Sequence, residues 1–226
     1  MPIDRSLLAR GLAALDLPPD GLLFWGLCNY LDEIDRQNPA LGLVKATTDE
    51  LVIKHALDSL APLPRIRIAL DAAAAARGEP SRPPSLADLG SGAGLPGIPL
   101  ALALPDASVD LIDRMTRRAR FLEDILPLVP VPNVRVIENQ VEHTRGSYDV
   151  VVFRAFRPFE RKLFKRVFAL CDPDGAVIAY KGKVDRARTE LAAIEGLYSS
   201  AEIEPVAVPL LAEERCIVVM RPAPKT

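Results

Sequence analysis

The residues best suited to chemistry lie in a glycine-rich stretch near the middle of the chain, LADLGSGAGLPGIPL at residues 86–100. Asp88 precedes three glycines at alternate positions, Gly90, Gly92 and Gly94, and two prolines follow them. Because glycine has no Cβ, the backbone of such a loop can lie directly against a ligand. Two ligand classes fit: the pyrophosphate of a dinucleotide held at the N-terminus of the next helix, or a nucleoside that carries no phosphate.

The position of the acid favours the second class of ligand. The spacing Gly92-x-Gly94-x-x-Gly97 matches the dinucleotide pattern, so this pattern alone does not decide. However, Asp88 lies inside the end of the predicted strand, just before the loop. An ionised carboxylate there would repel a pyrophosphate, but it could accept hydrogen bonds from an amino group or an ordered water. The order acid-x-Gly-x-Gly-x-Gly resembles the first motif of class I S-adenosylmethionine-dependent methyltransferases.

A second acid, Asp113, ends the next predicted strand, about 20 residues after Gly94. An acid at this place bonds the ribose hydroxyls in both ligand classes, so it indicates an adenosine ligand without choosing between them. The alternative is that Asp113 only caps the helix that begins near Met115. A predicted β-hairpin at the C-terminus favours a methyltransferase, because methyltransferase sheets characteristically add one.

Strands and helices alternate from residue 86 onward, which predicts an α/β fold around a mostly parallel, doubly wound, Rossmann-like sheet. Ligands of such sheets bind at the carboxyl ends of the strands. We expect strands at 86–89, 107–113, 133–138, 148–153 and 176–182, helices at 96–104, 115–129, 158–171 and 184–198, a turn at 172–175, and a hairpin formed by 202–210 and 215–221.

The N-terminal part has a different sequence pattern, which is almost entirely helical. Residues 1–77 show helical periodicity, and the stretch 78–85, rich in glycine, proline and serine, is typical of a connector. We therefore expect two units: an N-terminal helical extension with its connector, residues 1–84, and a Rossmann-like methyltransferase domain, residues 85–226.

Charge is unevenly distributed although the formal net charge is only −2. Residues 1–60 carry five Lys/Arg against nine Asp/Glu, whereas residues 154–188 carry ten against four. A second basic cluster lies in residues 114–120. Basic patches attract polyanions such as nucleic acids, although either cluster could instead be a solvated helix face.

Other features of the sequence exclude several classes of protein. No stretch approaches the ~20 uncharged apolar residues that span a bilayer, and charged residues interrupt the apolar N-terminus, which argues against a signal peptide. Three widely spaced cysteines indicate free thiols in a reducing compartment, so we expect a cytoplasmic protein without a membrane partner. His55 and His143 lack partners at ligand spacing, so we expect no metal site.

Several segments, in order, resemble one family, the RsmG (GidB) methyltransferases. These enzymes modify guanine N7 in the 530-loop region of 16S ribosomal RNA. The segments are HALDSL (55–60), DLGSGAGLPGIPLAL (88–102), LIDRMTRRARFLE (111–123), VEH (141–143), YDVVVFRAF (148–156), YKG (180–182) and EERCIVV (213–219). The run LPGIPLA goes well beyond a generic cofactor loop.

The resemblance implies S-adenosylmethionine as cofactor, 16S rRNA or the 30S subunit as partner, and an enzyme that acts as a monomer. The implied cofactor-binding residues are Asp88, Gly90, Gly92, Gly94, Leu95, Asp113, Val141, Glu142 and Arg154. Arg154 also corresponds to the family's arginine in the active-site mouth, and Lys181 and Arg215 to basic positions that face the RNA or the target base; we assign these three to catalysis. His55 and Asp58 belong to an H-x-x-D-S signature, whose role is either packing between the two units or the rim of the active site.

The chain departs from the family at three places. Gln140 stands where a basic residue is common, Cys216 where a basic residue or histidine is common, and residues 36–50 do not match an upstream Asn-Leu-Thr signature. These departures leave the cofactor loop intact, but they could alter how RNA docks on the N-terminal unit.

The chemistry agrees with the resemblance. Guanine N7 has an in-plane lone pair, so methylation needs alignment and no general base. The N/D-P-P-Y/F motif of amine methyltransferases is replaced here by FRAFRPF (153–159). We expect an exposed Arg154 to bond guanine O6 while it touches a phosphate or the cofactor carboxylate. Phe153, Phe156 or Phe159 could stack on the base or pack in the core.

Three functions remain open from the sequence. The first is an rRNA guanine-N7 methyltransferase. The second is a methyltransferase that acts on another RNA or a small molecule, suggested by Gln140 and the altered N-terminal signature. The third is a nucleotide-binding or RNA-binding protein without catalysis.

Overall fold

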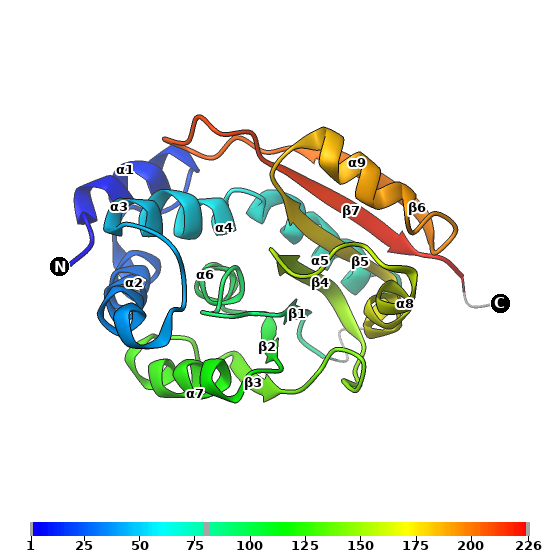
Figure 1. Ribbon diagram of the computed structural model, residues 1–226, viewed down its shortest axis with the longest axis horizontal. Helices are drawn as coiled ribbons and strands as arrows, with labels where there is room; N and C mark the ends of the chain where they lie inside the picture. The colour runs from blue at the N-terminus through cyan, green and yellow to red at the C-terminus, as the bar shows by residue number, and fades with distance from the viewer. Residues whose placement is uncertain (1, 79–81, 225–226) are drawn as a thin grey trace.

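A seven-stranded sheet runs through the centre of the computed structural model, which describes residues 2–78 and 82–224 (Figure 1). The strand order is β3-β2-β1-β4-β5-β7-β6. The bounds are β1 Ser85–Leu89, β2 Ser108–Asp113, β3 Val134–Glu138, β4 Tyr148–Arg154, β5 Cys171–Lys181, β6 Tyr198–Pro205 and β7 Cys216–Pro222. β1 to β5 pair in parallel, and β7 pairs antiparallel with both β5 and β6. The mostly parallel sheet and its C-terminal hairpin are therefore confirmed.

The four predicted crossover helices are present, and each is shorter than expected. They are α6 Gly97–Ala103, α7 Thr116–Ile125, α8 Arg161–Leu170 and α9 Val184–Ala192. A 3₁₀ turn, η2 (Leu126–Leu128), follows α7 and contains Pro127, which cannot supply the N–H that would continue an α-helix. The chain leaves α9 well before residue 198, passes Gly196 in a left-handed conformation (φ +81°) and begins β6 at Tyr198. Residues 198–201, predicted as helix or linker, are thus strand.

The sequence DPDG at residues 172–175 is not a separate turn before the strand, as was predicted. Instead it lies within the bounds of β5, where the pairing jumps from Tyr148 with Cys171 to Val150 with Ala176. One residue of β4 therefore faces four residues of β5, so these four residues form a wide bulge at the start of the strand. The bulge leaves the carboxyl end of β5, which carries Lys181, in regular register.

Side chains alternate between the two faces of the sheet, as strand geometry requires. Leu86 and Val150 join one hydrophobic core, whereas their neighbours Ala87 and Val151 join a second one on the opposite face. Residues of α8 and α9 belong to the second core, for example Phe164. These strands are buried on both faces, so near-continuous apolar runs were the correct signal for them.

The N-terminal helices pack directly on the first face of the sheet. They are α1 Arg5–Ala14, α2 Gly21–Leu41, α3 Thr48–Glu50, the π-helical segment η1 Leu51–Leu57, α4 Asp58–Leu60 and α5 Leu63–Arg77. Leu8, Leu27 and Leu57 lie in the same buried core as Leu86 and Val150. The boundary between 1–84 and 85–226 stays a prediction, and residues 79–81 of the connector lie outside the described residues. In residues 2–78 and 82–224, every helix is too short or too polar to span a bilayer.

Candidate active site

The glycine loop between β1 and α6 has the geometry that its sequence demands. Gly90, Gly92 and Gly94 have φ angles of +69°, +60° and +95°, where a residue with a Cβ is strained. The backbone N–H groups of Gly90 and Ser91 donate to the carbonyl of Ile112 at 2.7 and 3.2 Å. The loop is thereby fixed to the end of β2.

Asp88 is fully buried at the end of β1. Its Oδ2 accepts the N–H of Gly97 at 2.9 Å, and a Cβ at position 97 would come within 2.8 Å of the same oxygen. Its Oδ1 has no hydrogen-bond partner among the described residues. Burial raises the pKa of Asp88 to about 7, so this carboxyl is not the fully ionised group expected from the sequence. An unpartnered buried oxygen fits a donor supplied by a ligand amine or an ordered water.

Asp113 connects the loop to the next helix. Its Oδ2 accepts the N–H of Gly92 at 2.9 Å, and its Oδ1 accepts the N–H of Met115 at 2.9 Å. The carboxylate therefore bonds the N–H of the N-cap residue itself and not one in the first turn of α7, so it does not cap the helix as the alternative required, and it also holds the glycine loop. Its contact with a ribose stays a prediction.

A short segment after β4 crosses in front of the glycine loop. Phe156 lies against Gly90, where a Cβ would meet ring atom Cδ2 at 2.6 Å. The guanidinium of Arg157 lies over the Phe156 ring and forms an ion pair with Glu142, which lowers the pKa of that carboxyl. Ala155 adopts φ +46°, an uncommon conformation for a residue with a Cβ. Glu142 and Gly90, both predicted at the cofactor, are thus linked through this segment.

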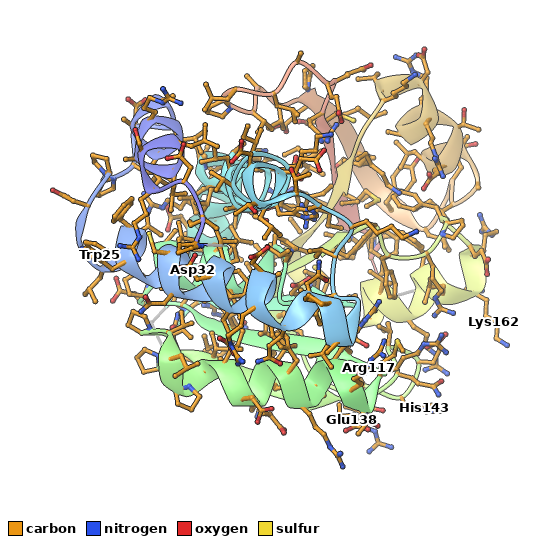
Figure 2. The ribbon with its side chains drawn as sticks, turned by 60° about the vertical axis from the view of Figure 1, so that its left-hand side comes forward. Trp25, Asp32, Arg117, Glu138, His143 and Lys162 are labelled. Carbon is orange, nitrogen blue, oxygen red and sulfur yellow. The ribbon has the colours of Figure 1, made fainter. Side chains whose placement is uncertain are left out.

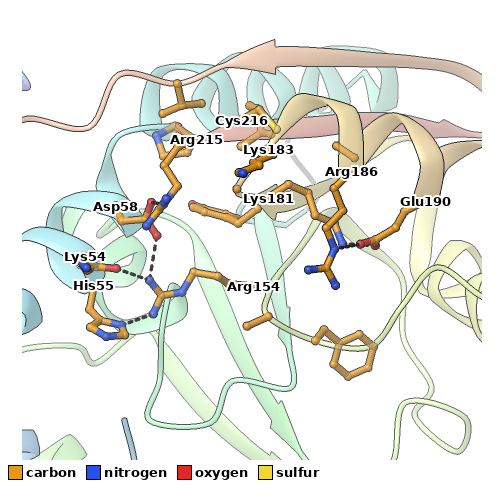
Figure 3. Close-up of a pocket in the computed structure, with 18 of the residues that line it drawn as sticks. Lys54, His55, Asp58, Arg154, Lys181, Lys183, Arg186, Glu190, Arg215 and Cys216 are labelled. Carbon is orange, nitrogen blue, oxygen red and sulfur yellow. Dashed lines mark hydrogen bonds and ion pairs between the residues drawn. The ribbon is translucent and has the colours of Figure 1, made fainter. Parts of the chain in front are cut away.

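A cavity of about 750 Å³ opens at the carboxyl ends of β4 and β5 (Figure 3). Its cationic lining residues are Lys45, Lys54, Arg154, Arg157, Lys181, Lys183, Arg186 and Arg215, and its carboxylates are Asp58 and Glu190. Among the described residues, those of the glycine loop do not line it, whereas Phe156 does. Phe156 therefore separates the cavity from the loop.

Arg154 lies at the centre of a buried network on one wall of this cavity. Its Nη1 donates to Asp58 Oδ2 and to the carbonyl of Lys54, both at 2.9 Å, and its Nη2 lies 2.8 Å from His55 Nδ1. Only 15% of the Arg154 side chain is exposed, so the expectation of an exposed arginine is wrong. Burial, and then the Arg154 charge, lower the pKa of His55 to about 4, so the imidazole is neutral and accepts from Arg154 at Nδ1.

Lys181 is also held by the fold. Its Nζ lies 2.5 Å from Glu190 Oε2 and 4.1 Å from the centre of the Phe159 ring, and Glu190 also pairs with Arg186. The two carboxylates of the cavity, Asp58 and Glu190, are therefore each bonded to two cationic side chains.

Comparison with known proteins identifies the family of this chain. The family model described as rRNA small subunit methyltransferase G matches residues 26–218. The chain belongs to this family. A ribosomal RNA small subunit methyltransferase G from Treponema pallidum is 34% identical over 226 residues, which cover 97% of this chain and 95% of the relative. The Legionella pneumophila protein of the same name is 35% identical over 96% of this chain and 94% of its own length.

Solved structures confirm the fold of this methyltransferase G family member. A SAM-dependent O-methyltransferase from Thermotoga maritima superposes with a TM-score of 0.55 at 13% identity, over 87% of this chain and 72% of its own. Magnesium protoporphyrin IX methyltransferase from Synechocystis, solved with bound SAM, gives 0.52 at 15% identity over 83% and 90%. The predictions of a class I methyltransferase fold and, at the level of family and fold, of S-adenosylmethionine as cofactor are confirmed.

The segment FRAFRPF (153–159) of this methyltransferase G chain contains three phenylalanines, which have different surroundings. Phe153 and Phe159 are buried and pack with Phe164, so they belong to the core. Phe156 is partly exposed and lines the cavity. Of the three, it is the residue available for stacking.

The arginines at the start of α7 lie elsewhere. Arg114, Arg117 and Arg120 are exposed and do not line the cavity. Figure 2 shows Arg117 and Lys162 projecting outward from the surface. Both interpretations of this cluster, a solvated helix face or an outer contact with a polyanion, therefore stay open.

Sequence reasoning missed three charged residues of the cavity: Lys45, Lys54 and Glu190. Glu190 could have been found, because it follows Arg186 by four residues on a predicted helix, a spacing that pairs opposite charges. No signal in the sequence indicates that Lys45, from the mismatched segment 36–50, reaches the site. Among the described residues, no three His, Cys, Asp or Glu side chains gather to hold a metal ion.

Proposed function

We propose that this chain transfers the methyl group of S-adenosylmethionine to N7 of a guanine in the 530-loop region of 16S rRNA, acting as a monomer in the cytoplasm on the RNA or the 30S subunit. The observation that carries the proposal is the cationic cavity at the ends of β4 and β5, whose lining residue Phe156 also lies against Gly90 of the glycine loop. A polyanion fits eight cationic side chains. The relatives' names supply the RNA.

The residues around the glycine loop fit the cofactor. The orphaned Oδ1 of Asp88 would accept from the amino group directly or through a water. Gly90 and Leu95 would lie against the cofactor, and Asp113 and Val141–Glu142 would border its ribose and adenine. When bound, S-adenosylmethionine supplies a methyl group on a positively charged sulfur. The chain itself has to orient the acceptor and exclude water from the transfer.

The cavity favours an acceptor that carries its own lone pair. Asp58 and Glu190, its only carboxylates among the described lining residues, are each engaged by two cations. His55 is a poor base because its pKa is lowered to about 4 and its Nδ1 faces Arg154. Guanine N7 needs no base, whereas an exocyclic amine must lose a proton. The side chains supply donors: Arg154 and Arg215 would bond guanine O6 or a neighbouring phosphate.

Methyl-labelled S-adenosylmethionine tests this proposal with naked 16S rRNA, isolated 30S subunits and an equal amount of 23S rRNA as control. We expect label at N7 of a guanine in the 530-loop region in at least one of the first two substrates. Label on an exocyclic amine, on another RNA or only on a small molecule would contradict it. Calorimetry with S-adenosylhomocysteine and NAD is a second test, because preferential binding of NAD would exclude a methyltransferase.

A further inference from the structure

The H-x-x-D-S signature, whose role the sequence left open, lies on η1 and α4 and reaches the cavity wall (Figure 3). Asp58 bonds two arginines at once: its Oδ2 lies 2.9 Å from Arg154 Nη1, and its Oδ1 lies 3.2 Å from Arg215 Nε. One arginine ends β4 and the other precedes β7. Because only 8% of the Asp58 side chain is exposed, water screens these pairs weakly.

Two further N–H groups of Arg154 are bonded to the same segment. The carbonyl of Lys54 and Nδ1 of His55 accept from its two terminal nitrogens. The segment is braced in turn, since Ser59 Oγ donates to the carbonyl of His55 at 2.6 Å and Tyr180 donates to the carbonyl of Ser59 at 2.8 Å. The guanidinium therefore has one defined orientation before any ligand arrives.

We propose that Asp58 is a positioning residue for methyl transfer, which fixes Arg154 and Arg215 together at the acceptor site while His55 sets the orientation of Arg154. The proposal rests on the proposed function for the identity of the reaction. Without the Asp58 carboxylate, two like charges would share one wall with no common counter-charge. Arg154 would keep only the Lys54 carbonyl and His55, and Arg215 only Glu213 and the Glu214 carbonyl, so the two guanidiniums would no longer be held relative to each other. Small displacements of this kind cost catalysis more than binding, since transfer depends on alignment.

A merely structural role is the competing explanation, because the same bonds join the N-terminal helices to the sheet. Arg65 and Glu204 offer a matched control, since they form an ion pair between α5 and β6 at 2.8 Å that does not line the cavity. If Asp58 only joined the two parts, Asp58→Asn and Glu204→Gln would affect methyl transfer in the same way.

Steady-state methyl transfer to the substrate used by the wild-type protein tests the role in catalysis. We expect Asp58→Asn to lower kcat at least tenfold, with the dissociation constant of S-adenosylhomocysteine unchanged within twofold, while Glu204→Gln keeps wild-type kcat. In an Arg154→Ala background, Asp58→Asn should lower kcat by a clearly smaller factor than in the wild-type protein, because only its effect on Arg215 remains. Wild-type kcat in folded Asp58→Asn, or fully multiplicative losses in the double variant, would overturn the proposal.

Substitutions of His55 test the same role with less risk that the protein fails to fold. His55→Asn can keep an acceptor toward Arg154 and should retain kcat within about threefold, whereas His55→Leu, which has none, should lose most of it. Equal kcat in these two variants would contradict the positioning role of His55 even if Asp58→Asn failed to fold.

A measurement without substrate separates failure of this inference from failure of the proposed function. In protein labelled with ¹⁵N-arginine, slow rotation of the Arg154 guanidinium should give resolved Nη signals, which merge in Asp58→Asn or, should that variant not fold, in His55→Leu. Unchanged signals would overturn the positioning role. A wild-type protein that methylates no 16S rRNA would instead refute the proposed function. The Nη signals of Arg154 would still show whether Asp58 and His55 fix the orientation of its guanidinium.

Discussion

Replacement of Arg154 by alanine should destabilise the protein as well as inactivate it. The variant removes three interactions, with Asp58, the Lys54 carbonyl and His55, from a side chain that is only 15% exposed. Breaking a buried ion pair by removal of one partner typically costs about 3–5 kcal/mol. Asp58 keeps Arg215 as a partner, so we expect a loss near the lower end, about 3 kcal/mol in the free energy of unfolding.

Urea denaturation monitored by circular dichroism measures this loss, and thermal unfolding should show a drop of about 6–12 °C for a chain of this size. Arg65→Ala is the control, because Arg65 and Glu204 are 23% and 32% exposed and their single pair should contribute less than about 1 kcal/mol. If Arg154→Ala unfolds at the wild-type urea concentration, the buried network around Arg154 does not exist in solution, and the expectation of an exposed arginine was right after all.

Three further outcomes follow from individual contacts. Gly90→Ala should lower the free energy of unfolding more than Gly92→Ala, since both have a positive φ but only at Gly90 would an added Cβ lie 2.6 Å from Phe156; equal losses, measured by urea denaturation, would contradict this contact. Lys45 and Lys183 line the cavity without an ion pair to any described residue, so each change to Gln should reduce the slope of log affinity for single-stranded RNA against log salt by about 0.7; an unchanged slope would exclude phosphate contact. In cofactor-free protein, the pKa of Asp88 is raised by burial, so the folded state keeps a proton that the unfolded state loses. The free energy of unfolding should therefore fall as the pH rises from about 4 to about 7 and then level off. Asp88→Asn should flatten the thermal midpoints over that range, and a profile equal to wild type would refute the raised pKa of Asp88.

The conformation of the glycine loop could be predicted from sequence because it depends on local steric constraints. Positive φ angles at Gly90, Gly92 and Gly94 and the tight approach of Gly97 to Asp88 each require glycine, whatever the rest of the chain does. The parallel strands could also be predicted from the sequence, since burial on both faces requires apolar runs. The ends of helices and strands could be predicted less well. The bulge at 172–175, for example, depends on pairing with β4, which no local pattern encodes.

The wall of the cationic cavity could not be derived in the same way. Arg154 finds its three partners almost one hundred residues earlier in the chain, and their arrangement follows from how η1 packs on the sheet. The family resemblance pointed to Arg154, His55 and Asp58 separately, but only the fold joins them. The burial of Arg154 was missed for the same reason, since an arginine at a strand end is usually solvated.

These contacts show which parts of the fold are common to class I methyltransferases and which position the side chains of the cavity. The class I sheet brings the glycine loop and the ends of β4 and β5 together, which is common to enzymes with different acceptors. Left alone, the ends of these strands would present Arg154 and Lys181 as flexible cations with no fixed direction. In this chain α9 supplies Glu190 to Lys181, and η1 with α4 supplies His55 and Asp58 to Arg154. The N-terminal helices therefore form one wall of the cavity, and their shared core with the sheet keeps that wall in register with the glycine loop.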